Sequence, residues 1–211
     1  LNKDGTKLSK RNLDSISLYQ FRKSGYTVNS ILSYLYSLGL NTDYNFENIL
    51  KDNFKDFNLE NISKNLPKID IHKIDFFQKN SLRSMNLKSL NNEFPQLKEL
   101  AITDAEWELI KENVEKYEDI RNLWNIINRR EITTQPSDDF IKLVIENLNK
   151  ISNLNFDEYV NYLLSVDNTL SKKEIFTNTR YIFTGNQNGP SVKDLYNYFG
   201  HDGLKKILNE Y

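Results

Sequence analysis

Apolar residues recur along most of this chain at the three- and four-residue spacing that one face of an α-helix requires. Between residues 28 and 38, Ile31, Leu32, Leu35 and Leu38 keep this spacing. Two further helices are expected near the end of the chain, at 192–199 and 203–211. The other predicted helices carry their apolar positions at Trp107, Ile110 and Val114; at Ile120, Leu123, Trp124 and Ile127; at Phe140, Val144, Ile145 and Leu148; and at Phe156, Tyr159, Val160 and Leu163.

Capping residues and helix breakers agree with this mainly α prediction. We expect Asp104 and Ser137 to cap the helices that follow them, because short polar side chains satisfy the free N–H groups of a helix start. Another helix is expected to end at Gly185 and the next to begin with Pro190 as its first residue. With only 7 glycines and 4 prolines, a turn-rich all-β fold is disfavoured.

Two polar stretches divide the pattern into three parts. One surrounds Pro67, and the other runs from Glu131 to Pro136. The predicted units are therefore 1–67, 68–132 and 133–211. The chain begins with Leu1 and its only methionine is Met85, so we expect a fragment of a longer protein.

Composition excludes several classes of protein. The 211 residues are 38% hydrophobic and 27% charged, which is typical of a globular chain. No apolar run approaches the roughly 18 residues of a membrane helix, so no membrane partner is expected. The absence of cysteine fits a reducing, cytoplasmic location. His72 and His201 are too few for a histidine metal cage, and no metal site is expected.

Charge narrows the choice of partners. The net charge is −1, which argues against a purely electrostatic nucleic-acid binder, and DNA is not expected as a partner. Residues 1–26 nevertheless carry six lysines and arginines against two aspartates. A protein of neutral net charge can still bind RNA through a local basic face and stacking contacts.

A basic loop is the first candidate site. Residues 4–11 read Asp-Gly-Thr-Lys-Leu-Ser-Lys-Arg, a turn dipeptide followed by three cations and two hydroxyls. Such a loop suits a triphosphate, where negative charge builds as pyrophosphate leaves. From spacing alone a solvated basic loop is the stronger interpretation.

Several motifs together resemble one family. Residues 7–11, Lys-Leu-Ser-Lys-Arg, resemble the Lys-Met-Ser-Lys-Ser loop of class I aminoacyl-tRNA synthetases in the form usual in glutamyl enzymes. Residues 25–39, 57–64 and 67–70 resemble later motifs of the glutamyl family, in the family's order. The chain is therefore similar to the C-terminal part of a bacterial glutamyl-tRNA synthetase. The resemblance implies a multi-helical stem-contact unit followed by an α-helical anticodon-binding cage.

The resemblance implies that this chain carries only part of the catalytic machinery of its parent. The parent would attach glutamate to tRNA(Glu) using ATP with Mg²⁺, and Lys7, Ser9, Lys10 and Arg11 would hold the ATP phosphates. Asn12 departs from the family pattern after this loop. The partner signature, His-Ile-Gly-His, and the catalytic sheet do not occur in the sequence. We therefore expect this fragment to be inactive by itself and to bind no metal.

A second motif concerns the anticodon. Residues 176–190 resemble the family's "LR-x-A-L-T-G-x-x-x-G-P" segment. By that resemblance Arg180 would meet an anticodon base, and Gly189 and Val192 would supply backbone and apolar contacts. From the residues alone, a plain helix–turn–helix connection remains the stronger interpretation, and an ion pair remains an alternative for Arg180.

Lys116 occupies a position of particular interest in residues 114–120. There, family members that discriminate strictly can carry an arginine that reads the third anticodon base. Lysine lacks the guanidinium fork, so we hypothesise relaxed reading and a parent that also charges tRNA(Gln). An exposed helix charge is the plain alternative.

The expected partners are thus tRNA(Glu), glutamate and ATP, with tRNA(Gln) under the hypothesis of relaxed reading, and the expected state is a monomer. A function of another class stays open, namely a non-enzymatic helical module that binds RNA or another protein.

Overall fold

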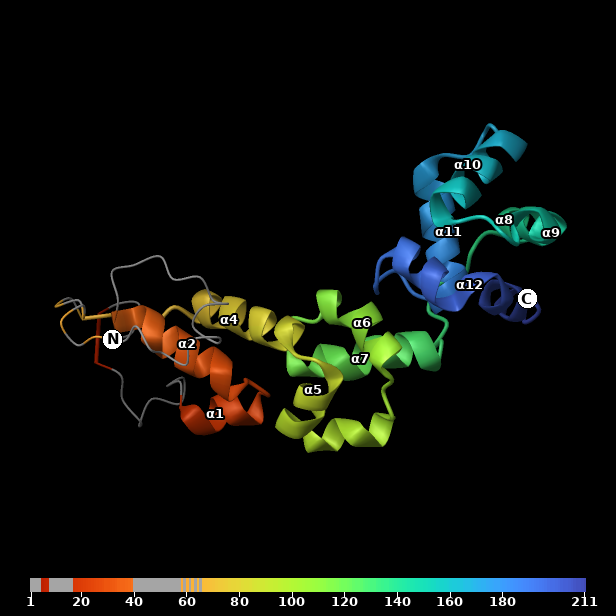
Figure 1. Ribbon diagram of the computed structural model, residues 1–211. Helices are drawn as coiled ribbons and strands as arrows, with labels where there is room; N and C mark the ends of the chain where they lie inside the picture. Colours follow the sequence, from red (N-terminus) through yellow and green to blue (C-terminus); the bar gives the residue numbers. More distant parts are fainter. Residues whose placement is uncertain are drawn as a thin grey trace. The chain divides into compact units, whose positions relative to one another are not determined.

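The computed structural model describes residues 5–7, 17–39, 58, 60, 62, 64 and 66–211. These residues form helices joined by turns, without a β-sheet among them (Figure 1), and the mainly α prediction is confirmed. The α-helices are α1 Leu18–Lys23, α2 Val28–Gly39, α4 Ile71–Ser84, α5 Leu87–Glu93, α6 Asp104–Ile110, α7 Tyr117–Asn128, α8 Asp138–Glu146, α9 Leu148–Ile151, α10 Phe156–Val166, α11 Lys172–Thr184 and α12 Val192–Leu208; the 3₁₀ helices are η2 Pro95–Leu100 and η3 Lys111–Asn113.

The chain forms two compact units. The first comprises residues 1–99 and 114–120, and the second comprises residues 100–113 and 121–211. Helix α7 therefore contributes residues 117–120 to the first unit and 121–128 to the second. The functional division expected at residues 67/68 and 132/133 stays a prediction. No helix among the described residues combines the length and apolar character needed to cross a membrane.

In the first unit, α2 packs against α4 (Figure 1). Tyr34 from α2 and Ile74 and Phe77 from α4 form its apolar cluster. A buried polar contact lies beside this cluster. The Gln78 amide oxygen accepts the N–H of Thr27 at 2.9 Å, and its amide nitrogen donates to the Gly25 carbonyl at 3.0 Å. Both ends of Gln78 are satisfied, which offsets the cost of burying an amide.

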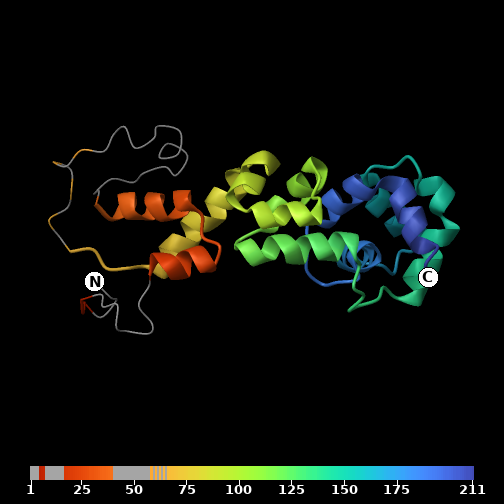
Figure 2. The ribbon, with the colours of Figure 1, turned by 90° about the horizontal axis from the view of Figure 1, so that it is seen from below.

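In the second unit, α11 packs along α12 and both contact α10 (Figures 1 and 2). Phe156, Tyr159, Phe183 and Tyr196 from these three helices are buried, and their ring centroids lie 4.9 to 6.3 Å apart in the contacting pairs. Such distances are typical of favourable aromatic pairs. The face of α10 predicted from the sequence is thus the face that packs into the core.

Helix starts follow the expected chemistry except at α6 and α12. The Ser137 hydroxyl accepts the N–H of Phe140 and caps α8, as predicted. Helix α6 is capped by Thr103 instead of Asp104, because Thr103 and Glu106 form a reciprocal capping box that satisfies two N–H groups. Asp104 becomes the first helical residue, where its charge still favours the helix dipole.

Two helices are predicted at 192–199 and 203–211, and α12 indeed contains two helical segments that meet at a kink. The kink lies at Gly200, whose φ of 62° and ψ of −171° are non-helical. The prediction that Pro190 opens this element is wrong. Ser191 is the N-cap and the helix begins at Val192, so Pro190 lies just before the cap.

Candidate functional site

Five of the eight residues of the basic loop, 4 and 8–11, lie outside the described residues. Lys7 is described and is exposed to solvent. Ser9, Lys10 and Arg11 belong to the segments that the structure does not describe. The assignment of these four residues to ATP therefore stays a prediction.

The turn between α11 and α12 is built around Gly185. This residue ends α11 in the left-handed conformation, with φ 62° and ψ 18°, as predicted for a helix C-terminus. A Cβ atom at Gly185 would lie 3.0 Å from the Cα of Ile132. The Gly185 carbonyl accepts the backbone N–H groups of Thr133 and Thr134 at 2.8 and 3.0 Å. The loop that precedes α8 is therefore bonded to the end of α11.

Thr184 and Asn186 hold the next part of the turn. The Thr184 hydroxyl oxygen accepts the N–H of Asn186 at 3.1 Å. Its O–H lies within reach of the Arg180 carbonyl at 2.8 Å. The Asn186 side-chain oxygen accepts the N–H of Asn188 at 3.3 Å. Side chains thus replace the helical hydrogen bonds that stop at Gly185.

Arg180 reaches across this turn from α11. Its Nη1 donates to the Pro190 carbonyl oxygen at 2.6 Å. Burial lowers the pKa of the Arg180 guanidinium from its ordinary value, although an arginine remains charged in proteins. A guanidinium has five N–H donors, and this partly exposed side chain therefore keeps donors for a ligand.

Gly189 lies directly beside Arg180. Its φ of 141° favours glycine, and a Cβ atom there would lie 3.7 Å from both Arg180 Nη1 and Ile126 Cγ2. Val192, the third predicted residue, is buried with 4% of its surface exposed. Arg180 and Gly189 are thus brought together at the turn, while the Val192 side chain is buried.

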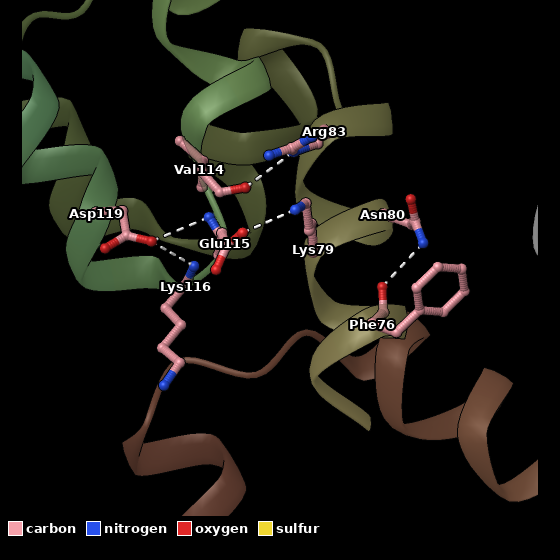
Figure 3. A network of polar contacts seen from close by, with 8 residues as sticks. All are labelled: Phe76, Lys79, Asn80, Arg83, Val114, Glu115, Lys116 and Asp119. Atoms are coloured by element: carbon pink, nitrogen blue, oxygen red, sulfur yellow. Dashed lines mark hydrogen bonds and ion pairs between the residues drawn. The ribbon is translucent and has the colours of Figure 1, made fainter. Parts of the chain in front are cut away.

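Lys116 belongs to the other unit, at the start of α7. Its side chain is exposed, and it extends away from the contacts that fix its main chain (Figure 3). One carboxylate oxygen of Asp119 accepts the N–H groups of Glu115 and Lys116 at 3.0 and 2.8 Å. Arg83 Nε donates to the Val114 carbonyl at 3.0 Å. The main chain around Lys116 therefore accepts and donates more side-chain hydrogen bonds than the main chain beneath an ordinary exposed helix charge.

The sequence did not identify the groups that hold Arg180 and Lys116 in position. Asp119 had a detectable signal, since an acidic residue in the first turn of a helix commonly bonds back to the residues before it. The Pro190 carbonyl had none, because a main-chain acceptor is independent of residue type.

Comparison with known proteins gives a consistent result along the whole chain. Glutamate–tRNA ligase 1 of Campylobacter fetus subsp. fetus is 30% identical over an alignment of 213 positions, gaps included, that covers 99% of this chain and 46% of that protein. Glutamate–tRNA ligase 2 of Rickettsia prowazekii is 26% identical over an alignment of 228 positions, gaps included, that covers 97% of this chain and 48% of that protein. The chain is homologous to bacterial glutamate–tRNA ligases. It spans about half the length of the curated relatives it matches, and no family model matches it.

Solved structures agree with the glutamate–tRNA ligase homology at the level of fold. The crystal structure of a glutamate tRNA ligase from Elizabethkingia meningosepticum aligns with a TM-score of 0.62 and 20% identity, covering 90% of this chain and 42% of that one. The glutamate-tRNA synthetase of Elizabethkingia anophelis gives a TM-score of 0.59 and 19% identity. Both alignments support the mainly α fold seen in the described residues.

Proposed function

We propose that this chain is the tRNA-recognising part of a glutamate–tRNA ligase, whose complete form attaches glutamate to tRNA(Glu) at the expense of ATP. The observation that carries the proposal is the match to the Campylobacter fetus ligase over 99% of this chain at 30% identity. Its role would be to hold the tRNA and place the acceptor end in a catalytic domain outside this sequence.

The α11–α12 turn is the proposed anticodon contact. Arg180 offers a planar cation that can stack on an unpaired base and bond to its edge, which is how proteins read single-stranded RNA loops. Gly189 leaves the surface beside it without a side chain, so a base can approach the main chain. Val192 would contribute an apolar support beneath the contact, since its side chain is buried.

Lys116 is the proposed contact to the third anticodon base. Glutamate and glutamine codons differ at the base that pairs with this position. Lysine offers a mobile point charge in place of a fork, and it can therefore meet either base. We propose relaxed discrimination, with tRNA(Gln) as a second substrate of the complete enzyme. Failure of the complete enzyme to glutamylate tRNA(Gln) would reject this part alone.

The ATP loop completes the proposal. Lys7, Ser9, Lys10 and Arg11 would contact the phosphates of ATP, which the complete ligase would use with Mg²⁺. Positive charge there would offset the charge that develops as pyrophosphate leaves. This chain alone would form no glutamyl-tRNA. We further propose a monomer acting in the cytoplasm, which light scattering on the purified chain checks in part.

Binding of the chain to a tRNA(Glu) transcript tests the proposal. The native transcript and one with a substituted anticodon are compared at low and moderate salt, because phosphate contacts weaken with salt while base contacts weaken less. We expect tighter binding to the native anticodon. Arg180→Ala should remove most of this preference, about tenfold if one base contact contributes about 1.4 kcal/mol.

The matched control is Arg129→Ala, which removes an exposed arginine from the same unit. It should leave the anticodon preference intact. Equal and weak binding to every RNA, unaltered by either substitution, would contradict anticodon reading by this chain. It would leave a helical module of another function as the better explanation.

A further inference from the structure

Both polar groups of the Lys116 main chain are bonded to one neighbouring residue, Asp119. Asp119 accepts the Lys116 N–H through its carboxylate at 2.8 Å. The backbone N–H of Asp119 donates to the Lys116 carbonyl at 3.1 Å. Both polar groups of the Lys116 peptide backbone are therefore bonded to Asp119, and the direction in which the side chain leaves the backbone is set (Figure 3).

The residues just before Lys116 are held from the opposite side by α4. Lys79 Nζ lies 2.7 Å from a carboxylate oxygen of Glu115, and Arg83 donates to the Val114 carbonyl. Residues 114–116 thus lie between two cationic side chains of α4 and one carboxylate of α7. These contacts use the main chain of 114–116 and the side chain of Glu115, and they leave the Lys116 ammonium to solvent.

This arrangement has a consequence for reading a base with a lysine. An exposed lysine has many rotamers, and each must be given up when the ammonium meets a defined acceptor. A flexible main chain beneath it would add further freedom to lose. A main chain that is already fixed confines the ammonium to a smaller volume before binding, and this preorganisation favours the contact.

We propose that Asp119 is a positioning residue, which fixes the main chain at Lys116 and thereby directs the lysine toward the third base of the tRNA anticodon. The inference rests on the proposed function, in which Lys116 contacts that base. It assigns to Asp119 an effect on one nucleotide, in addition to the stabilisation that any acidic residue gives to a helix start.

The test measures how much the third base contributes to binding. Two synthetic anticodon arms of tRNA(Glu) are used, one native and one lacking only the third anticodon base. The ratio of their dissociation constants is the third-base ratio. For the unaltered 211-residue chain we expect about fivefold or more, the lower end of what one base contact contributes. Lys116→Ala should bring the ratio close to one.

Three variants test whether Asp119 acts by orienting Lys116, by its negative charge or by stabilising the fold. Asp119→Ala should lower the third-base ratio nearly as far as Lys116→Ala. Asp119→Asn keeps an oxygen that can accept the same N–H groups, and most of the ratio should return. Glu118→Ala removes an equal charge from the same helical turn and should leave the ratio unchanged. The melting temperature of each variant shows whether it is folded.

Different failures have different meanings. If Asp119→Ala kept the third-base ratio of the unaltered chain while Lys116→Ala lost it, the positioning role of Asp119 would be overturned. Asp119 would then be a helix cap only. Equal losses in Asp119→Asn and Asp119→Ala would overturn it too, because charge and not the hydrogen-bond geometry would be the cause. A full ratio in Lys116→Ala would overturn both the inference and that contact. The Arg180→Ala experiment would still decide the proposed function separately.

Discussion

The guanidinium of Arg180 is bonded to the carbonyl oxygen of Pro190 at 2.6 Å, so the proposed base-reading residue also closes its own turn. Removing this side chain would disturb both the closure of the turn and the recognition of a base. A substitution is needed that keeps the closure and changes only the recognition.

Arg180→Lys is such a substitution. A lysine reaches a similar distance and can donate to the Pro190 carbonyl, but it lacks the planar guanidinium that stacks on a base. We expect the melting temperature to stay within about 2 °C of the original, because surface-adjacent changes that keep their hydrogen bond cost little. Anticodon preference, measured by tRNA binding, should fall several-fold. If the melting temperature fell clearly together with the tRNA affinity, the Arg180 side chain would be structural and not a base-reading group.

Gly25→Ala should severely destabilise the first unit. Gly25 has a φ of 71°, and a Cβ atom there would lie 2.4 Å from the Cβ of Tyr117. Strain at positive φ costs about 1–3 kcal/mol, and overpacking adds about 1–3 kcal/mol. We expect the free energy of unfolding to fall by at least about 2 kcal/mol in urea titration. Ser24→Ala, at an exposed neighbour, should change it by less than about 0.5 kcal/mol.

Gly200→Ala tests strain without a steric clash. Nothing lies within 4 Å of a Cβ built at Gly200, but its φ of 62° and ψ of −171° belong to a region that is nearly confined to glycine. We expect a loss of about 1–3 kcal/mol, measured by thermal unfolding. Asp202→Ala, at an exposed position just beyond it, is the control. An unchanged Gly200→Ala melting temperature would mean that α12 can straighten without losing its buried contacts.

Thr103→Ala and Asp104→Ala distinguish a cap from a first-turn charge. Thr103 accepts the N–H of Glu106 at 3.2 Å, and Glu106 accepts the N–H of Thr103 at 2.7 Å. Loss of the threonine cap should cost about 1 kcal/mol. Loss of the Asp104 charge should cost about 0.3–1 kcal/mol and should be reduced by added salt. The reverse order in urea titrations would contradict the observed cap.

The ion pair of Lys79 and Glu115 predicts that the free energy of unfolding depends on pH. The hydrogen bond from Lys79 and its charge lower the pKa of Glu115 below its ordinary value. Because the folded pKa is the lower one, the stabilisation is complete above about pH 4.3 and is lost as the pH falls through the folded pKa. The effect should be below about 1 kcal/mol, since the Glu115 side chain is 60% exposed. Urea midpoints from pH 7 to pH 3 should fall more steeply for the original chain than for Glu115→Gln.

The sequence predicts the buried face of α10 well and that of α2 poorly, because Leu32 and Leu35 of the expected α2 face are 41% and 52% exposed. All four apolar positions expected on α10, from Phe156 to Leu163, are buried, because a packed face repeats its signal along several turns. On α8 the spacing includes Ile145, which is 44% exposed. Thr103 and Asp104 are both good caps by type, and only the position of Glu106 decides between them.

The candidate site was predictable through its side chains and not through its main chain. Arg180 and Gly189 were identified by resemblance, and the structure places them side by side. The acceptor that holds Arg180 is a carbonyl of Pro190, and carbonyls occur at every residue. Asp119 carried a usable signal at the start of α7, but the fixing of Lys116 also depends on Lys79 and Arg83, which lie more than thirty positions away along the sequence.

The bonds from Thr133 and Thr134 to the Gly185 carbonyl change where this chain should accept inserted sequence. Residues 131–136 are polar and mostly exposed, and by composition they would be chosen for an epitope tag or a circular permutation site. Their backbone, however, forms part of the end of α11, so an insertion there would open the turn that carries Arg180. The exposed residues at 168–169, between α10 and α11, are the safer site, because their backbone makes only local contacts.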